Sequence, residues 1–284
     1  MISRRNLLAG ALLAAPAGAA DDWAAATERA LADLERRFGG RLGVAILDTG
    51  SARRASHRGS ERFALCSTFK VLAAAVVLAR VERGDDSLDR RILYRRDDLV
   101  PYSPVTERRL ADGMTLGELC EATMTLSDNT AANLLLDSFG GPAAVTAMLR
   151  GLGDGATRLD RREPALNDVP PGEERDTTTP QAMGDTLLRL VVGNALAPAS
   201  RHRLIEWLVN CKTGDQRLRA GVPAAWRVGD KTGSGPRGEA NDVAVMWPPG
   251  RAPMVVTAYY VNPAGSADAR NAVLAEVGRL VAAA

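Results

Sequence analysis

The sequence is poor in residues that bind metals. Its 284 residues include only two histidines and three cysteines. Cys66, Cys120 and Cys211 match no zinc-binding spacing, and His57 and His202 lie among arginines in stretches typical of a protein surface. We therefore expect no metal and no cofactor, and a Ser-His-Asp triad is poorly supported. An odd number of cysteines also leaves at least one thiol unpaired.

Long apolar runs and an excess of one charge are missing too. The net charge is +2 without a long run of basic residues, so nucleic acid and anionic membrane surfaces are not expected partners. No segment after residue 20 reaches the ~20 apolar residues of a membrane-spanning helix. Because nothing in the sequence indicates an obligate oligomer, a monomer is expected.

The first twenty residues have the pattern of an export signal that is removed. Arg4 and Arg5 precede a short apolar run, and small residues follow through Ala20, with Ala17-Gly18-Ala19 as a candidate cleavage site. The arginine pair favours the twin-arginine route. The alternative is a disordered tail with fortuitous arginines. Export would place the mature protein in the periplasm or outside the cell.

Lysine is scarce among the residues charged at pH 7. Lysine and arginine together number 36, but only Lys70, Lys212 and Lys231 are lysines, which leaves 33 arginines. A desolvated amine can lose its proton near neutral pH, whereas a guanidinium cannot. Since this sequence uses arginine for ordinary positive charge, its lysines are candidates for chemistry before any motif is considered.

The order of expected elements predicts an α+β fold. Apolar runs bounded by turn residues predict strands at 42–47, 53–58, 226–232, 242–247 and 255–261. Helical periodicity predicts helices at 22–38, 66–78, 115–124, 129–138, 142–150, 179–193, 198–210 and 267–283. We therefore expect an antiparallel sheet built from both ends of the chain, flanked by N- and C-terminal helices, with an all-α domain inserted.

The domain boundaries follow from this order. Residues 21–60 and 213–284 are assigned to the sheet domain, and residues 61–212 to the all-α domain. The latter includes an irregular loop at about 158–178, rich in Asp, Arg, Pro and Thr. A structureless stretch of this length inside a compact domain is usually functional.

Ser67 and Lys70 form the first candidate catalytic pair. They begin an apolar helix and lie one turn apart, so the amine can reach the hydroxyl and act as its base. The S-x-x-K pattern occurs about once by chance in a chain of this length. The alternative is a helix-capping serine followed by a solvated lysine, but an unpaired lysine in so apolar a helix would be costly.

Two further motifs carry hydroxyl and amine groups. Ser127-Asp128-Asn129 precedes a helix, where the same residues also serve as ordinary N-caps. Lys231-Thr232-Gly233-Ser234 ends a strand, and Gly233 allows a ligand to approach the backbone closely. A second Lys-Thr-Gly, Lys212-Thr213-Gly214, follows a helix ending near Cys211. We interpret its lysine as a last-turn residue and its glycine as a helix C-cap.

Glu163 and Asn167 lie four residues apart in the irregular loop and can hold one water between them. Glu163 precedes Pro164, a context that tolerates a cis peptide bond better than most. Arg161 and Asp176 bracket the stretch and can pair across its neck. The alternative interpretation is a solvated loop rich in charge.

The four motifs, in this order and at these separations, resemble those of the class A serine β-lactamases, which carry S-x-x-K, S-D-N and K-T-G. The resemblance covers essentially the whole chain after the signal. It implies hydrolysis of the β-lactam amide bond of penicillins and cephalosporins, and so antibiotic resistance. Penicillin-binding D,D-peptidases, one alternative, share three motifs but lack the Glu-x-x-x-Asn segment. The other alternative is a catalytically silent relative that binds wall fragments or a protein partner, and the presence of Ser67, Lys70 and Glu163 argues against it.

The resemblance implies a role for each residue. Ser67 attacks the lactam carbonyl, its proton passes to Lys70 or through water to Glu163, and Ser127 protonates the leaving nitrogen. Glu163, with Asn167, activates the water that hydrolyses the acyl-enzyme. The backbone N–H groups of Ser67 and Ser234 form the oxyanion hole. The implied substrate-binding residues are Tyr102, Asn129, Asn167, Arg217, Lys231, Thr232, Gly233 and Ser234.

Some positions depart from the commonest family pattern. Many relatives carry a carboxylate-assisting arginine on the strand after K-T-G, where this chain has Glu239-Ala240-Asn241. Arg217 resembles the alternative arginine of other members. Relatives that bridge the cysteine before the nucleophile have a second cysteine where this chain has Gly235. In relatives with a disulfide from the position of Cys120, the partner cysteine stands where this chain has Ala74. Neither disulfide is therefore expected.

Overall fold

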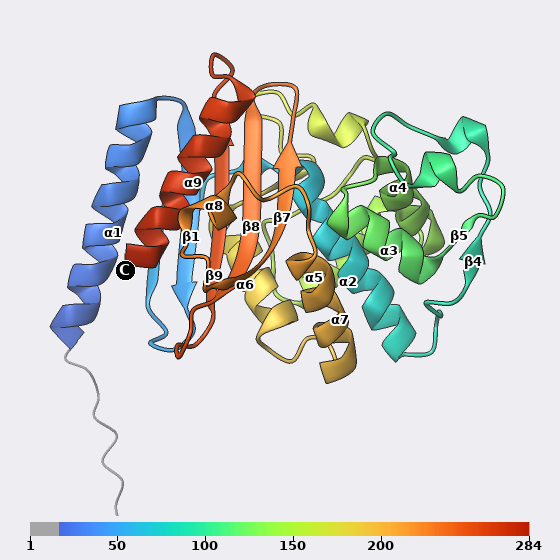
Figure 1. The fold of residues 1–284 in the computed structure, drawn as a ribbon, viewed down its shortest axis with the longest axis horizontal. Coiled ribbons are helices and arrows are strands. Elements are labelled where there is room, and N and C mark those ends of the chain that lie inside the picture. The colour runs from blue at the N-terminus through green and yellow to red at the C-terminus, as the bar shows by residue number, and fades with distance from the viewer. Residues whose placement is uncertain (1–16, 284) are drawn as a thin grey trace, which may run out of the picture.

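The computed structural model describes residues 17–283, with side chains described from residue 22 onward (Figure 1). The export signal predicted at residues 1–20 therefore lies almost wholly outside the described residues. The helices are α1 Ala17–Phe38, α2 Phe69–Glu82, α3 Leu116–Thr125, α4 Asn129–Ser138, α5 Pro142–Gly151, α6 Pro180–Val191, α7 Pro198–Val209, α8 Leu218–Gly221 and α9 Ala267–Ala283. The strands are β1 Arg41–Asp48, β2 Arg54–His57, β3 Phe63–Ala64, β4 Arg91–Ile92, β5 Met114–Thr115, β6 Thr177–Thr178, β7 Arg227–Ser234, β8 Glu239–Trp247 and β9 Met254–Val261.

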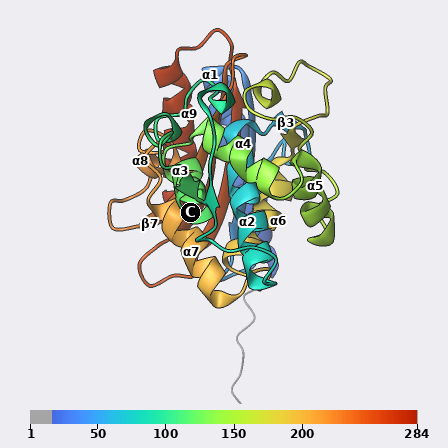
Figure 2. The ribbon, with the colours of Figure 1, turned by 90° about the vertical axis from the view of Figure 1, so that its right-hand side faces the viewer.

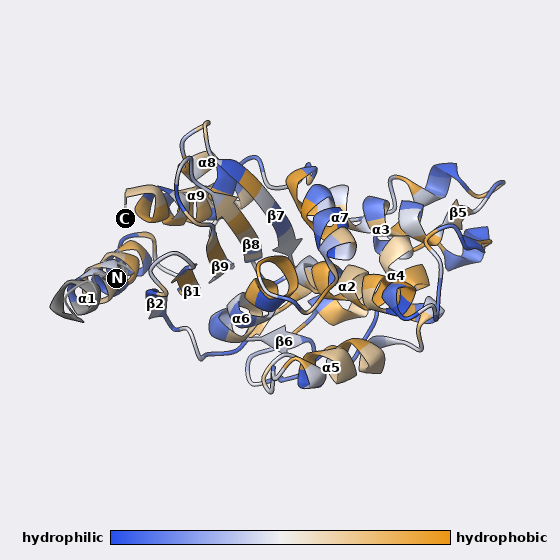
Figure 3. Cartoon of the chain, turned by 90° about the horizontal axis from the view of Figure 1, so that it is seen from below, coloured by the Kyte–Doolittle hydropathy of each residue, from blue (hydrophilic) through white to orange (hydrophobic). Residues whose placement is uncertain are grey.

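The main sheet joins the two ends of the described chain. Its five strands are antiparallel and lie in the order β2-β1-β9-β8-β7. Arg41 at the start of β1 pairs with Val261 at the end of β9, which places N-terminal and C-terminal strands side by side. Helices α1 and α9 cover one face (Figures 1 and 3). The predicted antiparallel α+β sheet with flanking helices is confirmed.

Each face of this sheet packs into its own core, because successive side chains on a strand point to opposite faces. Val44, Ile46 and Val256 pack with α1 and α9. Leu47 and Val255 lie on the other face, in a cluster continuous with α2 to α7. Both faces of β1 are therefore covered, which explains its nearly unbroken apolar run.

Helix α2 lies in the middle of the helical layer (Figure 2). Every residue from Phe69 to Leu78 is buried, as the lack of a polar face predicts. A 3₁₀ turn at Cys66–Thr68 leads into this helix. The turn packs against β7, the edge strand, so the start of α2 meets the sheet at a strand with one free edge.

The irregular loop, residues 158–178, is fastened at its neck. Arg161 Nε donates to Asp176 Oδ2 at 2.5 Å, as the sequence predicted. A short β3–β6 pairing holds the loop's end, and Arg158 bridges to Thr177. Within the loop only Ala165–Asn167 forms a 3₁₀ turn. We call residues 158–178 the Glu163 loop.

Across residues 17–283, no helix is both long enough and apolar enough to cross a bilayer.

Candidate active site

Ser67 lies in the tight turn that opens α2. Cys66 before it has a left-handed backbone, with φ of +43°, and Thr68 Oγ1 donates to Leu65 O at 2.7 Å. Because α2 is buried and starts here, the serine is presented at the helix N-terminus, where the helix dipole favours developing negative charge. The predicted placement of Ser67 is confirmed.

Gly233 allows β7 to approach this turn. A Cβ there would lie 3.1 Å from Cys66 Cβ and 3.2 Å from Ser67 N. The chain's own nucleophile turn is thus a close neighbour of Gly233, and the prediction that this glycine lets a ligand approach the backbone stays a prediction. The absent side chain allows the ends of β7 and α2 to meet.

Lys70 is completely buried and surrounded by oxygens. Its Nζ donates to Asn129 Oδ1 at 2.6 Å, Ser127 O at 2.7 Å and Ser127 Oγ at 3.2 Å. Glu163 Oε1 lies 3.2 Å away. Burial lowers the pKa of Lys70, and the Glu163 carboxylate partly opposes this. The sequence indicates that this amine can reach the Ser67 hydroxyl; the three N–H groups of the ammonium are instead shared among these four oxygens, and Glu163 contacts both residues.

Glu163 connects the loop to both members of the first pair. Ser67 Oγ donates to Glu163 Oε1 at 3.3 Å, and the same oxygen faces Lys70. The sequence predicts that Glu163 and Asn167 hold one water between them. Instead, Asn167 Nδ2 donates directly to Glu163 Oε2 at 2.5 Å. The Glu163–Pro164 peptide bond is cis. The Glu163 side chain is fully buried, so the solvated-loop interpretation is wrong for this residue, although Arg162 and Asp168 are exposed.

Asn133 on α4 was missed by sequence reasoning. Its Nδ2 donates to Glu163 O at 2.9 Å, and its Oδ1 accepts from Glu163 N at 3.0 Å. This pair of bonds fixes the backbone that carries the carboxylate. Asn133 lies four residues after Asn129, hence on the same helix face. That spacing is the only sequence signal for it.

The Ser127-Asp128-Asn129 motif has the capping role considered for it, and its catalytic role stays a prediction. Asp128 is the N-cap of α4, accepting from Ala131 N at 2.8 Å. Its other oxygen accepts from the backbone of Val105 and Thr106. Ser127, with φ of +59°, points its hydroxyl toward the site. The hydrogen bonds of Asp128 therefore hold the turn before α4, and this turn directs the Ser127 hydroxyl toward Lys70 and Lys231.

Lys231 lies on β7 and is also completely buried. Its Nζ donates to Ser127 Oγ at 3.1 Å and to Thr232 O at 2.9 Å. Burial lowers its pKa to about 8, and neighbouring Lys70 contributes to the shift. The Ser127 hydroxyl is thus held between two buried amines, since it also accepts from Lys70.

Arg217 brings a guanidinium to the end of β7, and β8, the strand after K-T-G, contains no arginine. Its Nη2 donates to Ser234 Oγ at 2.7 Å, and Nη1 donates to Gly233 O and Asn241 O, both at 2.7 Å. Asn271 Oδ1 on α9 accepts from Nε at 2.9 Å. Four contacts orient the group toward the end of β7, beside the predicted substrate-binding residues.

Tyr102 lies at the outer edge of the candidate site, in the segment Pro101–Tyr102 that we call the rim. Its side chain is 61% exposed, and its φ is +66°. Its carbonyl accepts from Asn129 N at 3.0 Å. The carbonyl of Pro101 accepts from Asn129 Nδ2 at 2.8 Å. Asn129 therefore fixes the rim while its Oδ1 contacts Lys70.

The second Lys-Thr-Gly was misread in part. Helix α7 ends at Val209 with Asn210 as its C-cap, so Lys212 and Gly214 lie beyond the helix. Lys212 is exposed, which agrees with the interpretation that the second Lys-Thr-Gly is structural and not catalytic. The hydroxyls of Thr213 and Thr232, however, are hydrogen-bonded at 2.5 Å. The segment supports the site from outside it.

The cysteines and histidines within residues 17–283 form no disulfide and no metal-binding cluster. All three cysteines are free and buried. Cys66 Sγ lies 3.0 Å from where a Cβ on Gly235 would be. This proximity is consistent with the disulfide of relatives that have a cysteine at the position of Gly235. His57 is less exposed than predicted, because its ring contacts Glu35 Oε2 at 2.7 Å. His202 is exposed on α7. Within the described range, no three His, Cys, Asp or Glu side chains are grouped to hold a metal.

Comparison with known proteins gives one consistent answer. The model of the β-lactamase enzyme family matches residues 26–284. β-Lactamase OXY-1 of Klebsiella oxytoca is 49% identical over 91% of this chain and 90% of its own length. β-Lactamase L2 of Stenotrophomonas maltophilia is 50% identical over 96% of this chain and 91% of its own. A solved ancestral class A β-lactamase (GNCA) is 65% identical, covers 90% of this chain and 98% of its own, and superposes with a TM-score of 0.89.

With the family model, the curated relatives and the solved fold in agreement over nearly the whole length, the chain belongs to the class A β-lactamases, serine hydrolases that open the β-lactam ring of penicillins and cephalosporins and so cause antibiotic resistance.

Proposed function

We propose that this chain hydrolyses β-lactams through an acyl-enzyme on Ser67, with the residue roles implied by its motifs. One observation carries the assignment. The Glu163 carboxylate contacts both the Ser67 hydroxyl, at 3.3 Å, and the Lys70 ammonium, at 3.2 Å. A nucleophile, an amine of lowered pKa and a carboxylate therefore meet in one buried place, which is the constellation that activates a serine.

In the first step, Ser67 Oγ attacks the lactam carbonyl carbon. Lys70 or Glu163 accepts the hydroxyl proton, and the backbone N–H groups of Ser67 and Ser234 stabilise the oxyanion. The C–N bond then breaks, and Ser127 gives its proton to the leaving nitrogen. The two lysines on Ser127 Oγ can return that proton along the same contacts.

Substrate recognition uses the end of β7 and the rim. Lys231, Thr232 and Ser234 hold the substrate carboxylate on the Gly233 strand, and Arg217 adds its charge through Ser234. The exposed ring of Tyr102 forms one wall. Asn129, already fixed to that rim, binds the side-chain amide of the substrate.

In the second step, Glu163 takes a proton from a water that attacks the ester carbonyl, with Asn167 orienting the pair. The ester C–O bond breaks and Ser67 recovers its proton. This step separates hydrolysis from the permanent acylation of a penicillin-binding D,D-peptidase. The buried Glu163 side chain, its direct bond to Asn167 and its backbone clamp from Asn133 favour hydrolysis.

We also propose that the chain is exported by the signal at residues 1–20 and acts as a monomer on small β-lactams. Arg4 and Arg5 before the short apolar run support export. N-terminal sequencing of the protein recovered from the periplasm, with a lysine pair replacing the two arginines as control, tests the route. Light scattering tests the oligomeric state.

Time-resolved intact mass with benzylpenicillin, alongside product formation, tests the chemistry. Wild type should turn over rapidly with at most a transient adduct. Glu163→Ala should still acylate but accumulate the adduct, because only the second step strictly needs the carboxylate. Ser67→Ala should show neither adduct nor turnover.

The other outcomes are equally informative. A stable wild-type adduct without turnover would support the D,D-peptidase alternative. Unchanged steady-state turnover in Glu163→Ala would contradict the deacylation role. Loss of adduct in Glu163→Ala, with the fold intact, would make Glu163 rather than Lys70 the base of the first step.

A further inference from the structure

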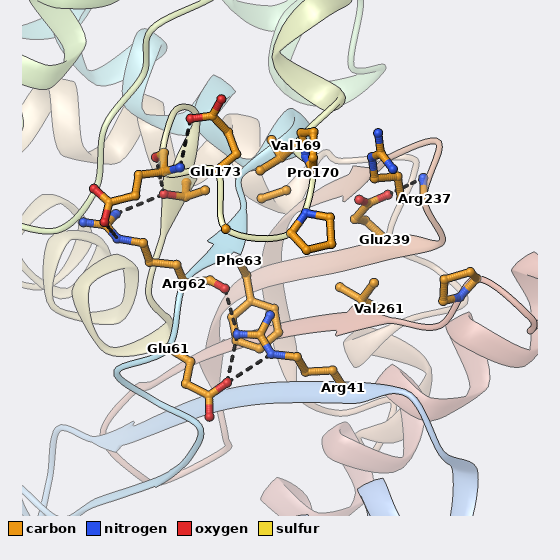
Figure 4. Close-up of a pocket in the computed structure, with 16 residues that line it drawn as sticks. Arg41, Glu61, Arg62, Phe63, Val169, Pro170, Glu173, Arg237, Glu239 and Val261 are labelled. Atoms are coloured by element: carbon orange, nitrogen blue, oxygen red, sulfur yellow. Dashed lines mark hydrogen bonds and ion pairs between the residues drawn. The ribbon is translucent and has the colours of Figure 1, made fainter.

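A cavity lies behind the Glu163 loop. It has a volume of about 680 Å³ and is lined by residues 169–174 of the loop, the starts of β1 and β8, the end of β9 and the short strand β3 (Figure 4). Sites for small organic molecules usually occupy about 300–1,000 Å³. The cavity is therefore large enough for such a ligand.

The cavity is separate from the catalytic cleft. None of the residues assigned to catalysis or substrate binding lines it. The loop lies between the two: Glu163 contacts Ser67, while Val169 and Pro170 line the cavity. Binding here can thus be measured without a β-lactam and independently of the proposed function.

Much of its wall is apolar. Phe63, Val169, Pro170 and Val261 line it, and Figure 4 shows Phe63 in the centre with the Arg41 side chain beside it. The Arg41 guanidinium lies 3.9 Å from the ring centroid. A ligand held here would have an apolar body that removes these surfaces from water.

Nearly every charge in the lining is already paired. Arg41 contacts Glu61 at 2.9 Å, and Arg237 contacts Asp168 at 2.8 Å. The remaining pairs are Arg62 with Glu174 and Glu173 with Arg175. The arginines are therefore not available to recruit an anion.

Glu239 is the exception. It is only 4% exposed, lines the cavity and has no ion-pair partner among the described residues. Its single side-chain hydrogen bond comes from the backbone N–H of Arg237, at 2.8 Å. A Cβ on Gly235 would lie 2.5 Å from Oε2, so the carboxyl is lodged against the β7–β8 hairpin. A buried carboxylate without a cation is costly.

We propose that this cavity binds a small organic cation with an apolar body, its ammonium on Glu239 and its hydrocarbon against Phe63, Val169 and Val261. The ligand would supply the one charge that the lining lacks. A charge-assisted hydrogen bond in a partly desolvated site is the strongest contact available to it.

Isothermal titration calorimetry with 4-phenylbutylamine tests the proposal, with the neutral 4-phenylbutan-1-ol as the matched ligand. The amine should bind wild type at least about tenfold more tightly than the alcohol, as expected for a charged hydrogen bond. Glu239→Gln should abolish that preference. Glu173→Gln, which removes one charge from the same lining where it is already paired, should preserve it.

Two further measurements fix the location and guard against misfolding. Val261→Trp, which fills the apolar wall, should abolish binding of both ligands even if Glu239→Gln does not fold. Glu163→Ala acylated by benzylpenicillin should bind the amine as wild type does. Equal affinity for amine and alcohol, unchanged binding by Glu239→Gln, exclusion of the amine by the acyl group, or no heat of binding at millimolar amine would each overturn the proposal.

Discussion

The tripeptide Lys-Thr-Gly occurs twice in this chain, and the two copies lie against each other. Lys231 is completely buried on β7, with its amine on Ser127 Oγ. Lys212 is exposed in the loop after α7, and its backbone N–H donates to Thr125 O. The same three letters thus give a buried amine in the site and a solvated amine outside it.

The second copy is nevertheless not inert. Thr213 is hydrogen-bonded to Thr232 at 2.5 Å, and Gly214 packs on Asp230, the residue before Lys231. The comparison teaches that burial and neighbours, not the letters, assign chemistry to a motif. The second copy contacts the first through its hydroxyl and its glycine, while its lysine points to solvent.

The largest expected difference between the copies is at the lysines. Lys231→Ala should lower kcat/KM for benzylpenicillin by about 10³-fold, roughly 4 kcal/mol, because it removes charged hydrogen bonds to Ser127 and to the substrate carboxylate. Lys212→Ala should stay within about twofold of wild type, since an exposed charge contributes little. Steady-state kinetics on the two variants decides. A similar loss of kcat/KM in both variants would contradict the proposed difference between the two lysines.

The glycine of the second copy should matter to stability. A Cβ on Gly214 would lie 1.7 Å from Asp230 Oδ2, and Asp230 is buried and paired with Arg219. Gly214→Ala should therefore lower the free energy of unfolding by about 3 kcal/mol, measured by urea denaturation. Gly151→Ala at the end of α5 is the control, because its Cβ would meet nothing within 4 Å. That control should be neutral or slightly stabilising.

The long elements could be predicted from the sequence because their periodicity is local. Helices α4 and α9 have the predicted bounds, 129–138 and 267–283. The four-residue α8 and the two-residue strands β4 and β5 could not be predicted, since tertiary contacts decide such short elements. The domain boundaries at 60/61 and 212/213 stay a prediction.

The candidate site divides in the same way. The residues proposed for the chemistry could be selected from the sequence because scarce lysines and ordered motifs are visible in it. Asn133, Thr213 and Asn271 were not found, because their roles consist of contacts with residues 19 to 54 positions away. The cavity behind the Glu163 loop has no sequence signal either, since its walls come from segments distant in the chain.

The buried lysine should also make substrate binding depend on pH. The pKa of Lys231 is lowered to about 8, chiefly by burial. Its amine is charged below that pH and neutral above it, so KM should rise as pH increases through about 8, approaching tenfold per unit once the neutral form dominates. Lys231→Arg keeps its charge throughout. In that variant this limb of the KM profile should be absent; an identical limb would assign the titration to another group, such as Lys70.

The smallest expected effect tests whether the second copy reaches the chemistry at all. Thr213→Val keeps the shape of the side chain but removes the hydrogen bond to Thr232, so kcat/KM should fall about three- to tenfold, or about 1 kcal/mol. Thr213→Ser retains the hydroxyl and should recover most of the loss. If the valine variant is as active as wild type, the 2.5 Å contact only joins two segments. If the serine rescues, the hydroxyl itself positions Thr232, and the two copies of Lys-Thr-Gly act as one site.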